Sequence, residues 1–230
     1  MNNRFAVIGL GQFGMSIALT LAERGAEVIA IDKELDKIEQ VKEDVAVAVS
    51  LDSTDRKALS AQNVQEVDGA VVAIGEDFES LILTTVILQE LKVKRIIARA
   101  ANVQQRLILE KLGVEEILSP EETVGKSLAE MLLHPSIRSF LNLPDEYEIV
   151  EVDVPKRVAN FTIADLKLRQ EYDLNIVTIK RVFTEVEDGE EKEVKHIIGV
   201  PRPDTSLKQS DQLIILGKTD DINRFIESNQ

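Results

Sequence analysis

The chain has 230 residues, 44% of them hydrophobic, and its 41 acidic against 27 basic side chains give a formal charge of −14 at pH 7. This acidity argues against a nucleic acid as partner, because binding phosphates requires a basic face. The sequence contains no cysteine, which excludes disulfides, thiolate catalysis and cysteine-type zinc sites.

The sequence shows no signal-peptide pattern, since Arg4 leads directly into the first apolar run. The longest apolar stretch, residues 80–89, lies between two glutamates and is far shorter than the about 20 residues that cross a bilayer. We therefore expect an intracellular protein without direct membrane insertion, so that any membrane connection would run through a partner.

Short apolar runs and amphipathic stretches alternate along the first half of the chain. Continuous Val, Ile and Ala runs between helices are typical of a parallel sheet covered on both faces. The predicted fold class is α/β, with a Rossmann-like, doubly wound, six-stranded sheet whose ligand binds at the carboxyl ends of the strands. We predict strands at 5–9, 27–31, 45–49, 69–74, 95–99 and 115–118, and helices at 13–24, 34–43, 55–62, 78–91 and 103–112.

The first predicted strand is followed by a G-x-G-x-x-G motif. Gly9 permits the tight turn, Gly11 lets the backbone approach phosphate, and Gly14 lets helix and strand pack closely. Asp32 ends the second strand, near the spacing of about 20 residues typical of dinucleotide-binding units, where a carboxylate accepts hydrogen bonds from ribose and repels a 2′-phosphate. We predict a nucleotide site that disfavours NADP; the alternative is a glycine turn that binds nothing.

A further helix is predicted to begin at Ser119. Ser119 is a good N-cap, Pro120 fits the first helical position, and Glu122 completes a capping box. Pro135 is expected to end or kink this helix, and a short helical piece is expected at 136–141.

From Glu146 the pattern changes to several strands with few helices, which indicates a small α+β domain. We predict strands at 147–154, 175–182, 196–200 and 213–216, helices at 163–171 and 220–227, and a charged hairpin tip at 185–195 around Asp188-Gly189. The expected domains are 1–119 for nucleotide binding, 120–143 as crossover helix and linker, and 144–230 as the α+β subdomain.

An oxidoreductase is the first alternative function, because many dehydrogenases use this glycine motif. Such an enzyme needs a proton donor or acceptor near the nicotinamide. Of the two histidines, His134 is predicted at a helix end, where a cation complements the dipole, and His196 on an exposed strand. Neither tyrosine is followed four residues later by the lysine of short-chain dehydrogenases. We therefore interpret the site as a sensor without catalytic residues.

These motifs, in this order, resemble the RCK family (regulators of conductance of potassium), in particular its KtrA/TrkA-type cytosolic subunits of bacterial potassium uptake systems. The resemblance covers nearly the whole chain. It implies a cytoplasmic homodimer that assembles into an octameric ring beneath a membrane-embedded potassium channel or transporter subunit and gates it on binding ATP/ADP or NAD(H). A regulatory module of another cation or amino-acid transporter is a further alternative. The matching segments are 5–14, Asp32, 52–55, 71–75, 119–121, 165–169, 174–177 and 211–217.

The resemblance also implies the residues that hold the nucleotide. Glu121 matches the position where relatives are thought to hold a divalent cation beside ATP. The residues so placed are Gly9, Gly11, Gln12, Phe13, Gly14, Asp32, Lys33, Asp52, Ser53, Thr54, Ile74, Gly75, Glu76, Arg99 and Glu121.

Several residues of the matching segments have a structural alternative. Asp52 and Asp55 could cap the following helix, an acid such as Glu121 is stabilised in a first helical turn anyway, and Arg99 could be an ordinary strand-end cation. Gln12 departs from the family, whose KtrA relatives often carry an arginine there that reaches the terminal phosphate. Since an amide brings no charge, this departure weakens the case for ATP/ADP over NAD(H).

Two further expectations concern the second subdomain and assembly. Arg169, Asn175 and Ile176 are similar to residues with which several relatives bind cyclic di-AMP, although Asn175 could simply cap a turn. The helix containing residues 81–91 is apolar nearly all round, so either the protein core or another subunit must cover it. The crossover helix, with Leu128, Met131 and Leu132, is a second candidate for dimer contacts.

Overall fold

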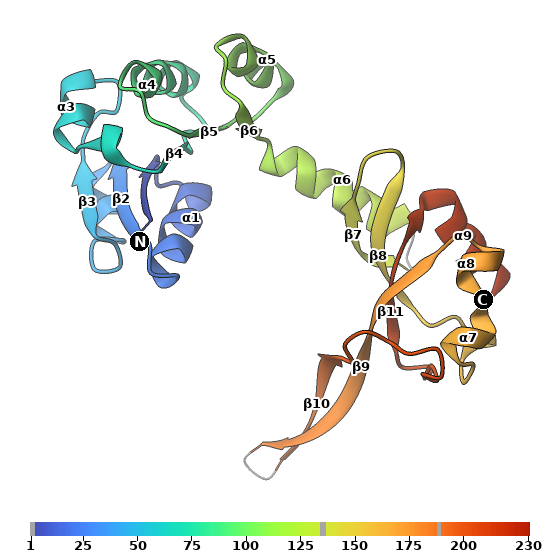
Figure 1. The fold of residues 1–230 in the computed structure, drawn as a ribbon. Coiled ribbons are helices and arrows are strands. Elements are labelled where there is room, and N and C mark those ends of the chain that lie inside the picture. The colour runs from blue at the N-terminus through green and yellow to red at the C-terminus, as the bar shows by residue number, and fades with distance from the viewer. Residues whose placement is uncertain (1–2, 134–136, 188–189) are drawn as a thin grey trace. The chain divides into compact units, whose positions relative to one another are not determined.

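The structure is a computed structural model that describes residues 3–133, 137–187 and 190–230. The chain separates into two compact units, residues 1–123 and 124–230 (Figure 1). In the described ranges, no helix combines the length and the apolar character that crossing a membrane requires.

The first unit contains a six-stranded sheet in the order β3-β2-β1-β4-β5-β6, and every pairing is parallel. This is the doubly wound order, in which the chain reverses direction between β1 and β4 and leaves a crevice at the carboxyl ends of these strands. The predicted Rossmann-like fold is confirmed. The strands are β1 Arg4–Ile8, β2 Glu27–Asp32, β3 Val47–Ser50, β4 Gly69–Val72, β5 Ile96–Arg99 and β6 Glu116–Leu118.

Helices cover both faces of this sheet because neighbouring residues of each strand point to opposite sides. Val28 and Ala30 of β2 belong to a core that also contains residues of α1 and α2, whereas Ile29 and Ile31 belong to a second core that contains residues of α3, α4 and α5. The helices are α1 Gln12–Glu23, α2 Leu35–Glu39, α3 Arg56–Ala61, α4 Phe78–Glu90 and α5 Val103–Lys111, with the 3₁₀ helix η1 Val64–Glu66.

The helix predicted at 34–43 is too long, since α2 ends at Glu39. The amide of Val41 bonds to the carbonyl of Ile38 at 3.1 Å, a tighter turn than the α-helix makes. This turn places Val41 in the core, where it is fully buried.

The second unit contains a five-stranded antiparallel sheet in the order β10-β9-β11-β8-β7. Its core packs one sheet face against the C-terminal helix around Leu174, Ile179, Leu213 and Phe225. The predicted α+β architecture is confirmed. The elements are α6 Pro120–Leu133, which spans the boundary between the units, β7 Ile137–Asn142, β8 Tyr147–Asp153, η2 Lys156–Val158, α7 Ile163–Leu166, α8 Leu168–Glu171, β9 Asn175–Glu187, β10 Glu190–Ile197, β11 Gln212–Lys218 and α9 Thr219–Ser228.

Two helical predictions in this unit are wrong. Residues 137–142 form strand β7, which pairs with β8 and places Ile137 opposite Val152 in the core. The helix predicted at 163–171 is split by Lys167, whose φ of +46° is left-handed. Leu166 and Leu168 are both buried, and a continuous helix would turn residues two apart to nearly opposite sides.

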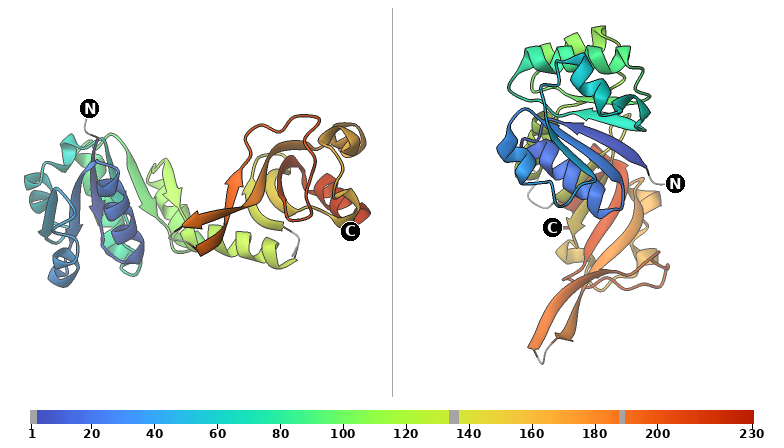
Figure 2. Two further views of the ribbon diagram at one scale, coloured as in Figure 1. Left: turned by 90° about the horizontal axis from the view of Figure 1, so that it is seen from below. Right: turned by 90° about the vertical axis from the view of Figure 1, so that its left-hand side faces the viewer.

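The hairpin tip predicted at 185–195 is also too long. Strands β9 and β10 continue through most of the expected loop at 185–195, so the pair forms an arm that reaches beyond the rest of its unit (Figures 1 and 2). Phe183 lies opposite Val194 in the ladder, and strand β10 ends at Ile197 instead of residue 200. The expected tip at Asp188-Gly189, like His134 and Pro135, lies outside the described residues.

Candidate functional site

A cavity of about 780 Å³ lies at the carboxyl ends of the first unit's strands. Its volume falls in the range of about 300–1,000 Å³ found for small-molecule sites. The loops after β1, β2, β3 and β4, the end of β5 and the start of α6 all contribute to its wall. Of the fifteen residues named from the sequence, all except Gly14 and Thr54 line this cavity.

The glycine loop has the geometry that its motif predicts. Gly9 has a φ of +91°, and a Cβ there would lie 3.0 Å from backbone atoms of Ala73 and Ile74. A Cβ on Gly14 would lie 1.9 Å from the carbonyl oxygen of Gly9. At Gly11, in contrast, a Cβ would meet no atom of the described residues within 4 Å, so the space beside this backbone is free for a ligand. Gly14 thus shapes the loop without lining the cavity.

Helix α1 presents its N-terminus to the cavity. Gly11 is the N-cap and offers no capping side chain, and the first turn contains no acidic residue. The first backbone N–H groups of a helix have no partners within it, and together with the helix dipole they favour an anion. Gln12 adds a neutral amide to this end of the cavity.

Asp32, at the end of β2, is 8% exposed. Its Oδ2 accepts a hydrogen bond from the N–H of Leu10 at 2.6 Å, and its Oδ1 accepts one from the N–H of Glu34 at 2.9 Å. The carboxylate therefore holds the glycine loop and the loop after β2 together. A carboxylate has about four acceptor positions, so Asp32 keeps capacity for ribose hydroxyls.

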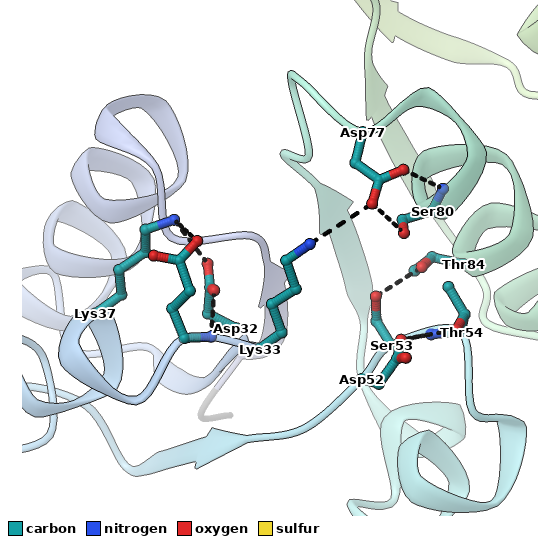
Figure 3. Close-up of polar contacts among 10 residues, drawn as sticks. Asp32, Lys33, Lys37, Asp52, Ser53, Thr54, Asp77, Ser80 and Thr84 are labelled. Atoms are coloured by element: carbon teal, nitrogen blue, oxygen red, sulfur yellow. Dashed lines mark hydrogen bonds and ion pairs between the residues drawn. The ribbon is translucent and has the colours of Figure 1, made fainter.

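Lysines and acids face each other around the mouth of the cavity (Figure 3). The Nζ of Lys37 lies 3.0 Å from Glu34 and 3.8 Å from Asp32, and its pKa is raised first by the hydrogen bond to Glu34 and further by the charge of Asp32. The Nζ of Lys33 lies 3.6 Å from Asp77, in the loop after β4. This second pair joins the walls contributed by β2 and β4.

Two aspartates near the cavity close local turns. Asp52 accepts hydrogen bonds from the N–H and hydroxyl of Thr54 at 2.9 and 2.7 Å, and these bonds lower its pKa. Asp55 caps α3 by accepting from the N–H groups of Lys57 and Ala58. The capping alternative therefore holds for Asp55, whereas Asp52 lines the cavity.

Arg99, at the end of β5, and Glu121, in the first turn of α6, form an ion pair in the wall of the cavity. The guanidinium lies 5.7 Å from the ring centre of Phe13, and a Cβ on Gly75 would lie 2.5 Å from its Nη1. The pKa of Glu121 is lowered first by a hydrogen bond from its own N–H and then by Arg99. The Nε of Arg99 is buried and has no hydrogen-bond partner among the described residues, whereas the Arg99 side chain as a whole is 21% exposed and lines the cavity.

Glu121 was the expected cation ligand. In the part of the chain that the structure describes, no group of three or more His, Cys, Asp or Glu residues could hold a metal ion. Four polar residues that were not predicted from the sequence also line the cavity: Glu34, Lys37, Asp77 and Ser80. The only feature of the sequence that could have identified these four residues is their position, a few residues after the ends of the second and fourth strands.

The second unit has its own cavity, of about 680 Å³, which includes all three residues predicted there. Arg169 donates from Nε and Nη2 to the side-chain oxygen of Asn175 at 3.0 and 2.6 Å. Ile176, Val177 and Pro201 supply apolar wall. The cavity therefore combines a guanidinium with an apolar surface. His196 is exposed on β10, beside Glu185.

Comparisons with known proteins match both halves of the chain to known domains. Residues 5–120 match the TrkA-N domain and residues 147–229 match the TrkA-C domain. The chain is 37% identical to Ktr system potassium uptake protein C of Bacillus subtilis, across 98% of this chain and 96% of the relative. It is 33% identical to Ktr system potassium uptake protein A of the same organism, across 97% and 96%. The structure of the GsuK channel bound to NAD is similar over 100% of this chain and 39% of that one, with a TM-score of 0.62; at 16% identity this likeness concerns the fold alone.

Proposed function

Since the chain belongs to the family that joins a TrkA-N domain to a TrkA-C domain, we propose that it is a nucleotide-sensing regulatory subunit of a potassium uptake system. The observation that carries this proposal is the end-to-end similarity to two Ktr system potassium uptake proteins. Residues 1–119 bind the nucleotide and helix α6, Pro120–Leu133, is the crossover helix. The second subdomain, expected from residue 144, also includes strand β7, Ile137–Asn142, which pairs with β8. The role is regulatory, and no bond of the nucleotide is made or broken.

The cavity of the first unit supports a nucleotide ligand. The N-terminus of α1 and the open side of Gly11 would receive phosphates, and the guanidinium of Arg99 would donate to one of them. Asp32 would accept from the ribose, and its charge would repel a 2′-phosphate. We propose ATP or ADP as the ligand, with NAD(H) as the alternative because Gln12 is neutral. With ATP, Glu121 would contribute one carboxylate to a divalent cation beside the phosphates.

Regulation requires a partner and at least two conformations. A nucleotide can shift their populations only by binding one of them more tightly. We propose that the protein forms a homodimer, assembles into an octameric ring at the inner face of the membrane, and there controls a membrane-embedded potassium channel or transporter subunit. Exposed apolar side chains on α6, among them Val124, Leu128 and Leu132, support a role of this helix in subunit contacts.

The cavity of the second unit is proposed to bind cyclic di-AMP. Arg169 would pair with a phosphate, and the apolar wall would contact the bases. Asn175 would orient the guanidinium through the hydrogen bonds that it already accepts.

Calorimetric titration of the purified chain with ATP, ADP, NAD⁺ and NADH tests the proposal most directly. We expect saturable binding at one site per chain and no change of the nucleotide after incubation. Solution mass measurement should show an oligomer, and the tagged chain should retain a potassium transport subunit from solubilised membranes. Carbonyl-dependent oxidation of NADH at an enzymatic rate would overturn the regulatory assignment in favour of an oxidoreductase.

A further inference from the structure

A buried hydrogen bond connects the wall of the first cavity to helix α4. The hydroxyl of Ser53, in the loop after β3, lies 2.7 Å from the hydroxyl of Thr84 (Figure 3). Ser53 lines the cavity and is 8% exposed, while Thr84 is fully buried. A buried hydroxyl that loses its partner costs more than the bond contributed, so this pair keeps the loop against the helix.

The neighbouring threonine of α4 satisfies its hydroxyl within the helix. Thr85 is also fully buried, but its hydroxyl donates to the carbonyl of Leu81, one turn earlier in the same helix, at 2.7 Å. Threonine hydroxyls in helices commonly find such a partner. Thr84 instead pairs with Ser53, across an interval of 31 residues.

A second contact ties the start of α4 to the opposite wall. Asp77, the N-cap of α4, accepts hydrogen bonds from the N–H and hydroxyl of Ser80 at 3.1 and 2.7 Å. The same carboxylate pairs with Lys33, which follows β2. Helix α4 therefore contacts the loop after β3 through Thr84 and the loop after β2 through Asp77, on both sides of the cavity.

We propose that α4 responds to occupancy of the cavity through these two contacts, and that Thr84 is a positioning residue that holds Ser53 and its loop in the conformation that binds the nucleotide. The inference rests on the nucleotide site of the proposed function. Because coupling is reciprocal, a nucleotide that requires this loop conformation also stabilises α4, and a change in α4 alters nucleotide affinity. Leu83, next to Thr84, is 44% exposed, so a shift of α4 also changes the outer surface.

Thr84→Val, with Thr85→Val as the matched control, tests the inference in the full-length protein. Both variants remove one buried hydroxyl from α4 while keeping the side-chain shape, so both should lower the melting temperature. Only Thr84→Val should weaken binding of the tightest of the four nucleotides, by roughly fivefold, the effect of losing one ordinary hydrogen bond. Thr84→Ser, which restores the hydroxyl, should bind like the wild type.

Two further measurements separate positioning from stability. Ser53→Ala and Thr84→Val should be non-additive for nucleotide affinity, because they break the same bond. At saturating nucleotide, hydrogen exchange of the α4 amides should slow in the wild type and in Thr85→Val, and should slow less in Thr84→Val, which keeps only the Asp77–Lys33 contact. If Thr84→Val fails to fold, Ser53→Ala takes its place in the exchange experiment.

The possible failures are distinguishable. A wild-type chain that binds none of the nucleotides overturns the proposed function, and the inference with it. Equal affinities and equal α4 protection in the Thr84→Val and Thr85→Val variants, with binding intact in the wild type, overturn the inference alone.

Discussion

Replacing Asp32 tests the ribose contact, and the structure decides which substitution is informative. Alanine would leave the N–H of Leu10 without its 2.6 Å acceptor in a buried position. Such a loss costs about 1–3 kcal/mol, and each kcal/mol lowers the melting temperature by about 2–4 °C for a chain of this length. Weaker binding by Asp32→Ala would therefore report a displaced glycine loop as readily as a lost ribose contact.

Asp32→Asn avoids most of this damage. Its amide oxygen can still accept from the buried N–H of Leu10, while the N–H of Glu34, an exposed residue, can bond to water instead. For the ligand, a charged hydrogen-bond acceptor becomes neutral. This change should weaken the binding free energy of NAD⁺ or ADP by roughly 1–2 kcal/mol, which corresponds to a roughly 5- to 30-fold higher Kd. NADP⁺ should lose less or gain, because a repulsive charge beside its 2′-phosphate disappears.

The assay pairs calorimetric titration with thermal denaturation of the wild type and both variants. We expect Asp32→Asn to melt within a few degrees of the wild type, to bind NAD⁺ and ADP more weakly, and to discriminate less against NADP⁺. Unchanged affinity in a folded Asp32→Asn variant would refute the ribose assignment.

Three further predictions concern other parts of the cavity. Gly14→Ala should severely destabilise the first unit in thermal denaturation, since its Cβ would lie 1.9 Å from the oxygen of Gly9. Gly11→Ala, in contrast, should melt normally but bind nucleotide at least tenfold more weakly in titration, because its methyl group enters the space open to phosphate. Arg99→Gln should weaken ADP binding about tenfold or more in a salt-dependent manner, while adenosine, which has no phosphate, binds as before. The hydrogen bonds from Ser80 lower the pKa of Asp77 in the folded chain. The ionised Asp77 carboxylate should therefore stabilise the fold fully above the unfolded pKa of about 3.9, and this stabilisation should be lost as the pH falls through the lower folded value. The melting temperature of Asp77→Asn should accordingly fall less than that of the wild type between about pH 5 and pH 3.

The sheet of the first unit could be predicted because its signals are local. Each strand of this sheet is short and mostly apolar, and buried residues such as Ile29 and Ala30 serve different cores on the two faces. The site followed from the same information, since parallel strands end at one edge and residues directly after them meet there. Whether these residues bind a nucleotide remains a prediction, although the structure brings most of them to one cavity.

The features that escaped prediction depend on contacts distant in sequence. The charged residues of the β9–β10 arm suggested a loop, yet Glu185 lies opposite Lys192 in the ladder, an arrangement that favours strand pairing. The left-handed conformation of Lys167 follows from burying leucines on both sides of it. Likewise, nothing near Ser53 in the sequence indicates Thr84 as its partner.

The charge around the first cavity constrains how a nucleotide can act there. Carboxylates outnumber cations among the lining residues, and the guanidinium of Arg99 is already paired with Glu121. Under the proposed function, a phosphate that accepts from Arg99 competes with Glu121 and adds a negative charge beside it. Glu121 lies in the first turn of α6, the helix that spans the boundary between the two units. The exchange of one ion pair would therefore change the electrostatic environment where this helix begins, and ligands with different phosphate charge would do so to different degrees.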